Sequence, residues 1–136
     1  MKAVLELHND ISEVSLLGEW IEQVGEEFQL PASCVFQLNL ALEEAVVNVM
    51  NYAYPGQEGM PVLLTAEAKD DGTYEFVLED EGVEFDPTQS EEPDISLAAE
   101  DRPIGGLGIF LVMNIMKEVT YERRSERNVL RMSYKP

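Results

Sequence analysis

The spacing of hydrophobic residues changes along the chain, and each spacing predicts a type of secondary structure. Apolar side chains recur every three or four positions over residues 11–28, with glutamates on the other face, as in a helix packed on a core. Ser12 is the predicted N-cap of this helix. A second helical pattern covers residues 32–54 and stops at Pro55-Gly56. Residues 1–9 alternate apolar and polar side chains and predict an edge strand.

The rest of the chain predicts two β-hairpins with a loop and a helix between them. The expected strands are residues 61–69 and 74–79, joined by the turn signal Asp70-Asp71-Gly72, and residues 119–124 and 128–134, joined at residues 125–127. The acidic segment 86–103 predicts a loop, and a glycine-rich start leads into a helix over residues 105–116. This order of elements favours an α+β fold, a two-layer α/β sandwich with a mixed, mostly antiparallel sheet and helices on one face.

Length and composition predict a single domain over residues 1–136. The chain is 45% hydrophobic, which is enough for a core, and no linker or repeat divides it. The lone Cys34 excludes an internal disulfide. No run approaches the roughly 20 apolar residues that span a bilayer, and the first residues lack the apolar segment of a secretory signal. We therefore expect a cytoplasmic protein without a membrane partner.

Charge is the most unusual feature of the composition. The formal net charge is −18, and residues 3–68 contain no lysine or arginine. Because nucleic-acid binding requires clustered positive charge, direct binding to nucleic acid is not expected. A solvated, self-repelling surface is the favoured interpretation, and the alternative is a surface that attracts a basic protein partner.

Four polar features could carry chemistry, and the first lies on the second predicted helix. Glu44 and Asn48 are four residues apart and share one helix face, where a carboxylate and an amide could hold a hydrated Mg²⁺ ion. The apolar residues around them leave few solvent-exposed positions nearby. Taken alone, however, an ordinary helix surface explains this pair better.

The other three features follow in the second half of the chain. Asp80 ends a predicted strand, where its carboxylate could accept a hydrogen bond from a purine amine, and Gly82 would let the backbone approach a flat ligand. Arg102, the only basic residue between Lys69 and Lys117, is a candidate for binding phosphate. Free N–H groups at a helix start bind anions, and the third helix opens with Gly105, Gly106, Leu107 and Gly108. An acidic turn, a surface arginine and an ordinary glycine-rich helix start are the alternatives.

In this order the motifs resemble those of the GHKL ATPases, which share the Bergerat fold. Glu44-x-x-x-Asn48 on a helix resembles the N box, Asp80-x-Gly82 after a strand resembles the G1 box, and Gly106-x-Gly108 resembles the G2 box. A short chain with a final strand at Asn128-Val129-Leu130 looks most like the RsbW/SpoIIAB-type anti-sigma-factor serine/threonine kinases. The resemblance covers residues 3–134.

The resemblance implies a role for each motif residue. Glu44 would act as the general base or orient the attacking hydroxyl, and Asn48 would bind Mg²⁺. Asp80 would bind the adenine of ATP, beside Gly82. The phosphates would lie near Gly106 and Gly108, with Gly105, Leu107 and Arg102 as neighbours, and residues 86–104 would form the ATP lid. The expected cofactors are therefore ATP and Mg²⁺.

The function implied by the resemblance is that of an ATP-dependent serine/threonine kinase. It would phosphorylate a STAS-domain anti-anti-sigma partner and otherwise bind a sigma factor, and relatives of this type often form homodimers. Tyr52 stands where many kinase members have a histidine, and Glu84 where many members have a second glycine. These departures motivate one alternative, a nucleotide-dependent binding module without kinase turnover. Another is an interaction domain whose motifs are vestigial.

Overall fold

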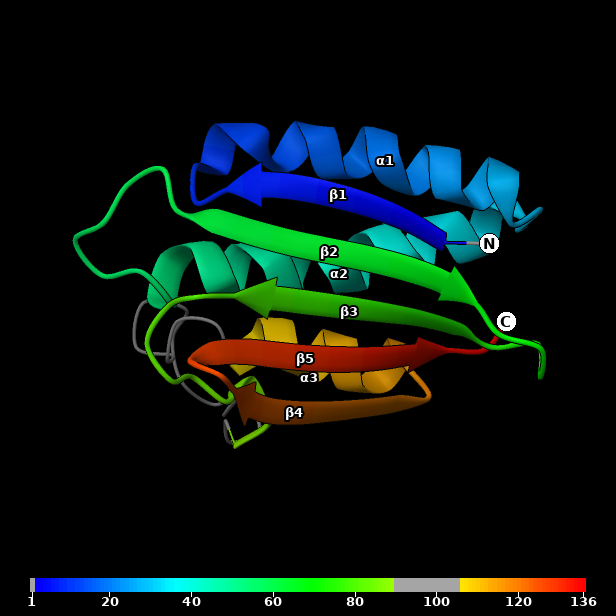
Figure 1. Cartoon of the computed structure of the whole chain (residues 1–136). Helices are drawn as coiled ribbons and strands as arrows, with labels where there is room; N and C mark the ends of the chain where they lie inside the picture. The colour runs from blue at the N-terminus through cyan, green and yellow to red at the C-terminus, as the bar shows by residue number, and fades with distance from the viewer. Residues whose placement is uncertain (1, 90–105) are drawn as a thin grey trace.

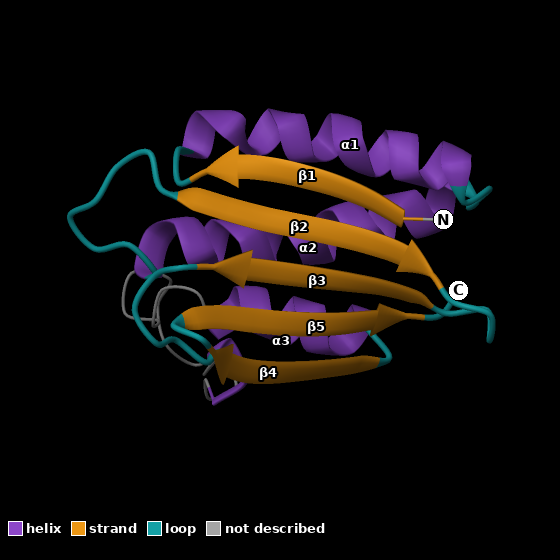
Figure 2. Cartoon of the chain, in the orientation of Figure 1, coloured by secondary structure: helices purple, strands orange, loops and turns teal. Residues whose placement is uncertain are grey.

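A computed structural model describes residues 2–89 and 106–136 of the chain. The described residues form a five-stranded sheet in the order β1-β2-β3-β5-β4, with three α-helices on one face (Figure 1). The strands are Lys2–His8 (β1), Pro61–Ala68 (β2), Tyr74–Asp80 (β3), Glu118–Arg124 (β4) and Arg127–Tyr134 (β5), and the helices are Val14–Glu27 (α1), Ala32–Tyr52 (α2) and Gly106–Ile115 (α3). Figure 2 shows the helical layer behind the strands, which confirms the predicted two-layer α+β fold.

The two long helices follow the predicted hydrophobic spacing but differ at their ends. The cap of the first turn is Asp10 and not Ser12, because the Asp10 carboxylate accepts a hydrogen bond from the Ser12 N–H at 3.0 Å. A short aspartate side chain reaches the N–H two residues on, which starts a 3₁₀ turn over Ile11–Glu13 before α1 begins. The second helix ends at Tyr52, two residues earlier than predicted.

All four strand pairings among the described residues are antiparallel, so the sheet is not mixed as predicted. β3 and β4 do run in the same direction (Figure 1), but the final hairpin places β5 between them. The two hairpin turns have the backbone that tight turns require. Gly72 has φ of +86°, and Ser125 and Glu126 have φ of 51° and 64°, as in a two-residue type I′ turn.

The core lies between the sheet and the helices, with α2 as its central helix. Alternate residues of β2 and β3, including Leu64, Phe76 and Leu78, are buried against α2 residues such as Leu42 and Val46. The burial of alternate strand residues is the period-two pattern expected for a sheet covered on one face. Among the described residues, no helix has the length and apolar character needed to cross a membrane.

Candidate functional site

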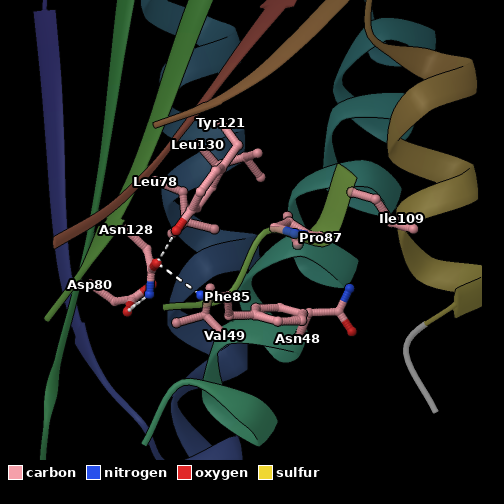
Figure 3. A pocket seen from close by; sticks show the side chains of 11 residues that line it. Asn48, Val49, Leu78, Asp80, Phe85, Pro87, Ile109, Tyr121, Asn128 and Leu130 are labelled. Atoms are coloured by element: carbon pink, nitrogen blue, oxygen red, sulfur yellow. Dashed lines mark hydrogen bonds between the residues drawn. The ribbon is translucent and has the colours of Figure 1, made fainter. Parts of the chain in front are cut away.

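Several elements meet at one end of the sheet, where a small cavity lies. The end of α2, the ends of β3 and β4 and the starts of β5 and α3 are all on the left side of Figure 1. Apolar walls with a few convergent polar groups are typical of small-molecule sites. The described lining residues are Ala45, Asn48, Val49, Leu78, Asp80, Phe85, Pro87, Ile109, Tyr121, Asn128 and Leu130, most of them labelled in Figure 3.

Asn128, the second residue of β5, is the centre of the hydrogen bonds at this end. Its buried side-chain nitrogen donates to Asp80 Oδ1 at 2.8 Å and to the Val83 carbonyl at 2.7 Å. Its side-chain oxygen accepts hydrogen bonds from the Tyr121 hydroxyl at 2.5 Å, the Phe85 N–H at 3.1 Å and Arg123 Nη1 at 3.2 Å. Since the nitrogen meets only acceptors and the oxygen only donors, the network fixes the orientation of the amide (Figure 3).

Asp80 is a carboxylate buried at the end of β3, with 4% of its surface exposed. Its Oδ1 accepts hydrogen bonds from Asn128 and from the Gly82 N–H, the latter at 2.9 Å. Burial raises the pKa of the Asp80 carboxyl, while these two hydrogen bonds and the charge of Arg123 oppose the rise. Both donors reach the same oxygen, so within the described part of the chain Oδ2 remains available as an acceptor.

Gly82 is required by close packing against the end of α2. A Cβ atom at this position would lie 2.1 Å from the Ala53 carbonyl oxygen, so any side chain here would force the backbone to shift. The Val83 N–H donates to the same carbonyl at 2.8 Å, and Arg123 Nη1 donates to the Gly82 carbonyl at 2.8 Å. The turn after β3 is thereby held on α2, and this contact is a structural reason for a glycine that the sequence alone did not reveal.

Two tyrosines at the end of α2 differ in their hydrogen bonding. The Tyr54 hydroxyl donates to the Pro61 carbonyl at 2.6 Å and accepts from the Glu81 N–H at 2.6 Å, and burial raises its pKa. The Tyr52 ring lies 5.8 Å from the Phe85 ring, and its hydroxyl is buried without a hydrogen-bond partner among the described residues. Tyr52 is therefore in ring contact with Phe85, a residue that lines the cavity.

The two predicted residues of α2 take different positions. Asn48 is 5% exposed and lines the cavity, and in the view of Figure 3 Phe85 lies between its amide and the Asp80–Asn128 pair. Glu44, one turn earlier on the same helix, is half-buried and is not among the described lining residues. The Glu84 side chain is exposed.

The predicted anion-binding segment falls only partly within the described residues. Gly106, Leu107 and Gly108 form the first turn of α3, in agreement with the predicted helix start. Arg102, Gly105 and residues 90–104 of the predicted lid lie outside the described residues. In the remaining part of that lid, Pro87–Gln89 form a 3₁₀ turn, and Pro87 lines the cavity.

Four side chains that build this end of the molecule were not predicted to be site residues, namely Phe85, Tyr121, Arg123 and Asn128, although Asn128 was part of the final-strand motif. One signal was available, because a buried strand position rarely carries an amide without a specific partner. The partners themselves depend on the hairpin register, which pairs Arg123 with Asn128 and Tyr121 with Leu130.

The fold and the site together define an α+β domain with a pocket between the sheet and its central helix. Residues 7–134 match the histidine kinase-like ATPase domain, and the chain belongs to this family. It is 27% identical over 115 residues to the serine/threonine-protein kinase BtrW of Bordetella bronchiseptica. This alignment covers 84% of the present chain and 80% of BtrW.

Two solved structures share the fold. The crystal structure of the RsbU and RsbW domains of Rv1364c from Mycobacterium tuberculosis aligns with a TM-score of 0.70 at 12% identity, over 99% of this chain and 32% of that one. The histidine kinase domain of the blue-light activated histidine kinase EL346 from Erythrobacter litoralis aligns with a TM-score of 0.58 at 12% identity, over 91% of this chain and 59% of that one. The chain thus spans less than two thirds of either structure, and the likeness is one of fold.

Proposed function

We propose that the chain binds Mg·ATP at the cavity and transfers the γ-phosphate to a serine or threonine of a partner protein. The observation that carries this proposal is the buried Asp80 carboxylate, held by Asn128 in an apolar slot of a histidine kinase-like ATPase domain. The similarity to BtrW, a serine/threonine-protein kinase, supports a protein as the acceptor of the phosphate.

Asp80 is the group that would recognise the adenine. Two N–H donors hold its Oδ1, which leaves Oδ2 to accept a hydrogen bond from the exocyclic amine of the base. The flat faces of the base would lie against apolar side chains that line the cavity: Val49, Leu78, Ile109 and Leu130. The donors, acceptor and walls therefore fit an adenine in their chemistry.

The size of the cavity requires it to open when a nucleotide binds. The cavity volume is about 10 Å³, close to the minimum that holds one water molecule. Leu78 and Leu130 belong to central strands, whereas Phe85 and Pro87 belong to the segment after β3. We therefore expect Phe85 and Pro87 to move away from the strands when ATP enters.

Glu44 and Asn48 are the proposed residues for the chemistry of transfer. Phosphoryl transfer depends mainly on positioning and on neutralising the charge of the phosphates, which a bound Mg²⁺ would supply. The Asn48 side-chain oxygen would be a ligand of that ion, because Mg²⁺ takes oxygen ligands. Glu44, one turn away, would orient the acceptor hydroxyl or take its proton.

The phosphates would be held at the start of α3. Gly106 and Gly108 lie in its first turn, where free N–H groups favour anions. Leu107 lies in the same turn, and Gly105 and Arg102 are proposed as further phosphate neighbours on sequence grounds alone.

The proposed acceptor is a STAS-domain anti-anti-sigma factor, and the proposed regulatory role is that of a cytoplasmic anti-sigma factor. The fold shared with a chain that contains an RsbW domain supports this role. The net charge of −18 also suits a partner with a basic surface. A homodimer is part of the same proposal.

Tyr52 favours a second candidate function, a module that binds nucleotide and switches partners without turnover. The residue stands where many kinases of this type have a histidine, and its hydroxyl has no hydrogen-bond partner in the described part of the chain. A tyrosine hydroxyl does not take up and release a proton at neutral pH as the imidazole of histidine does.

Incubation with γ-labelled ATP, Mg²⁺ and a purified STAS-domain protein separates the two functions. The kinase proposal predicts label on the STAS protein with the wild type, none with Glu44→Gln, and normal transfer with the matched control Glu43→Gln. ATP binding without transfer by the wild type would instead establish the module. Absence of ATP binding by the folded protein would contradict both.

A further inference from the structure

A solvent-open groove runs between α1 and α2, and the proposed nucleotide site does not use it. Its volume is about 800 Å³. The described residues that line it include Gly18, Glu22 and Gly25 of α1 and Val35, Phe36 and Asn39 of α2. These α2 residues belong to the first half of the helix, whereas Ala45, Asn48 and Val49 of the cavity belong to the second half. The groove is thus separate from the cavity.

Two glycines shape the side of the groove that α1 forms. A Cβ at Gly25 would lie 2.5 Å from Val35 Cγ2, so glycine allows the helices to approach closely there. At Gly18 the nearest atom to such a Cβ would be Asn39 Oδ1 at 3.8 Å, so this position has room for a side chain. The space above Gly18 can therefore hold an apolar side chain from another molecule.

One wall of the groove is apolar, and the other is acidic. Phe36, on α2, is 65% exposed, and the partly buried Val35 lies beside it in the groove lining. On α1, Glu19, Glu22 and Glu26 are exposed at helical spacing along the groove. None of the three has an ion-pair partner among the described residues, and residues 3–68 contain no lysine or arginine.

We propose that this groove binds a basic amphipathic helix of a protein partner. The apolar face of that helix would pack on Phe36 and over Gly18, and its lysines or arginines would lie opposite Glu19, Glu22 and Glu26. A second copy of the chain fits poorly, because two copies at −18 would bring acidic walls together without a basic residue on either helix. This docking surface does not depend on the nucleotide site.

The test uses a synthetic 18-residue peptide of leucine and lysine with helical amphipathic spacing, and a scrambled peptide of the same composition. Calorimetry should show that the full chain binds the amphipathic peptide at least about tenfold more tightly than the scrambled one. Gly18→Leu, which fills the groove, and Phe36→Ser, which removes its apolar wall, should each weaken binding about tenfold or more.

A charge-matched control separates docking from general attraction. The triple variant of Glu19, Glu22 and Glu26 to lysine should abolish binding of the amphipathic peptide. The control variant carries Glu58→Lys, Glu118→Lys and Glu122→Lys, at exposed positions outside the groove. It alters the net charge equally and should keep most of the affinity for the amphipathic peptide.

Three results would overturn the proposal. The two triple variants could lose affinity equally, Gly18→Leu and Phe36→Ser could both bind as the wild type does, or the wild type could bind both peptides alike. Sedimentation gives a further check, because a self-association that Gly18→Leu abolishes would make the groove a contact between copies. Melting curves show whether each variant is folded. If Gly18→Leu does not fold, the affinity of Phe36→Ser for the peptide decides the test.

Discussion

Replacement of Asn128 by alanine tests the hydrogen-bond network that holds the candidate site together. Two partners keep another bond, because Asp80 Oδ1 still accepts from the Gly82 N–H and Arg123 still donates to the Gly82 carbonyl. Three groups lose their hydrogen bond to the Asn128 side chain, namely the Val83 carbonyl, the Phe85 N–H and the Tyr121 hydroxyl. The cost of the substitution comes mainly from these three.

A buried polar group without a partner costs about 1–3 kcal/mol, and water entering the space left by the side chain reduces that cost. We therefore expect Asn128→Ala to lower the free energy of unfolding by about 3 kcal/mol. For a domain of this size the melting temperature should fall by about 10 °C. The matched control is Asn114→Ala, an exposed amide bonded only to the Phe110 carbonyl among the described residues, which should cost less than about 0.5 kcal/mol.

The charge of Asp80 gives this cost a pH dependence. Because burial raises the pKa of Asp80, the folded protein holds the proton more tightly than the unfolded chain. The stability from this group is fully present below the unfolded value of 3.8 and is lost as pH rises through the folded pKa. Loss of the Asn128 hydrogen bond raises that pKa further, so Asn128→Ala should cost more near neutral pH than in mild acid.

The assay is urea unfolding, followed by the fluorescence of Trp20, the single tryptophan, which is 7% exposed in the core. A loss of less than about 1 kcal/mol with Asn128→Ala would refute the view that this amide holds the turn after β3 to β4 and β5. An equal cost in mild acid and at neutral pH would refute the role assigned to the Asp80 charge.

Three further substitutions test separate parts of the account. Gly82→Ala should lower the free energy of unfolding by about 1–3 kcal/mol, because its Cβ meets the Ala53 carbonyl. Gly18→Ala, at an open helix position, should raise the free energy of unfolding by up to about 1 kcal/mol. A Gly82→Ala protein that is more stable to urea than Gly18→Ala would be inconsistent with the packing. Tyr52→Phe removes a buried hydroxyl that has no partner within residues 2–89 and 106–136, and it should leave the melting temperature unchanged or slightly higher, so a clear drop would reveal a further partner. Asn48→Ala should weaken the dependence of ATP binding on Mg²⁺ in calorimetry, and an unchanged dependence would remove Asn48 as a ligand.

The fold could be predicted because its signals are local. Helical spacing defined α1 and α2, and Asp70-Asp71-Gly72 marked a hairpin. Two predictions were wrong for different reasons. The N-cap depended on a choice between two competing local hydrogen bonds, and the mixed sheet depended on the order of the strands. Asp10 caps the first turn in place of Ser12, and the insertion of β5 between β3 and β4 removes the parallel pairing that a mixed sheet would need.

Residues of the candidate site could be selected from the sequence only where a short segment of the chain carries the signal. Asn48 was selected by its spacing from Glu44, and Asp80 by its place at the end of a predicted strand, and both line the cavity. The network around Asn128 depends on β5 lying between β3 and β4, which no local pattern states. Gly82 was noticed for its freedom to approach a ligand, but its contact with Ala53 requires knowledge of where α2 ends.

The claim that Asp80 binds adenine is tested most directly by titrating Mg·ATP and Mg·GTP into the wild type and into Asp80→Asn. A hydrogen bond to a charged group contributes about 1.5–3 kcal/mol, so Asp80→Asn should bind ATP at least about tenfold more weakly. The wild type should prefer ATP to GTP, and the variant should lose that preference while Trp20 fluorescence still reports a folded core. ATP affinity that is unchanged in a folded Asp80→Asn protein would contradict the account.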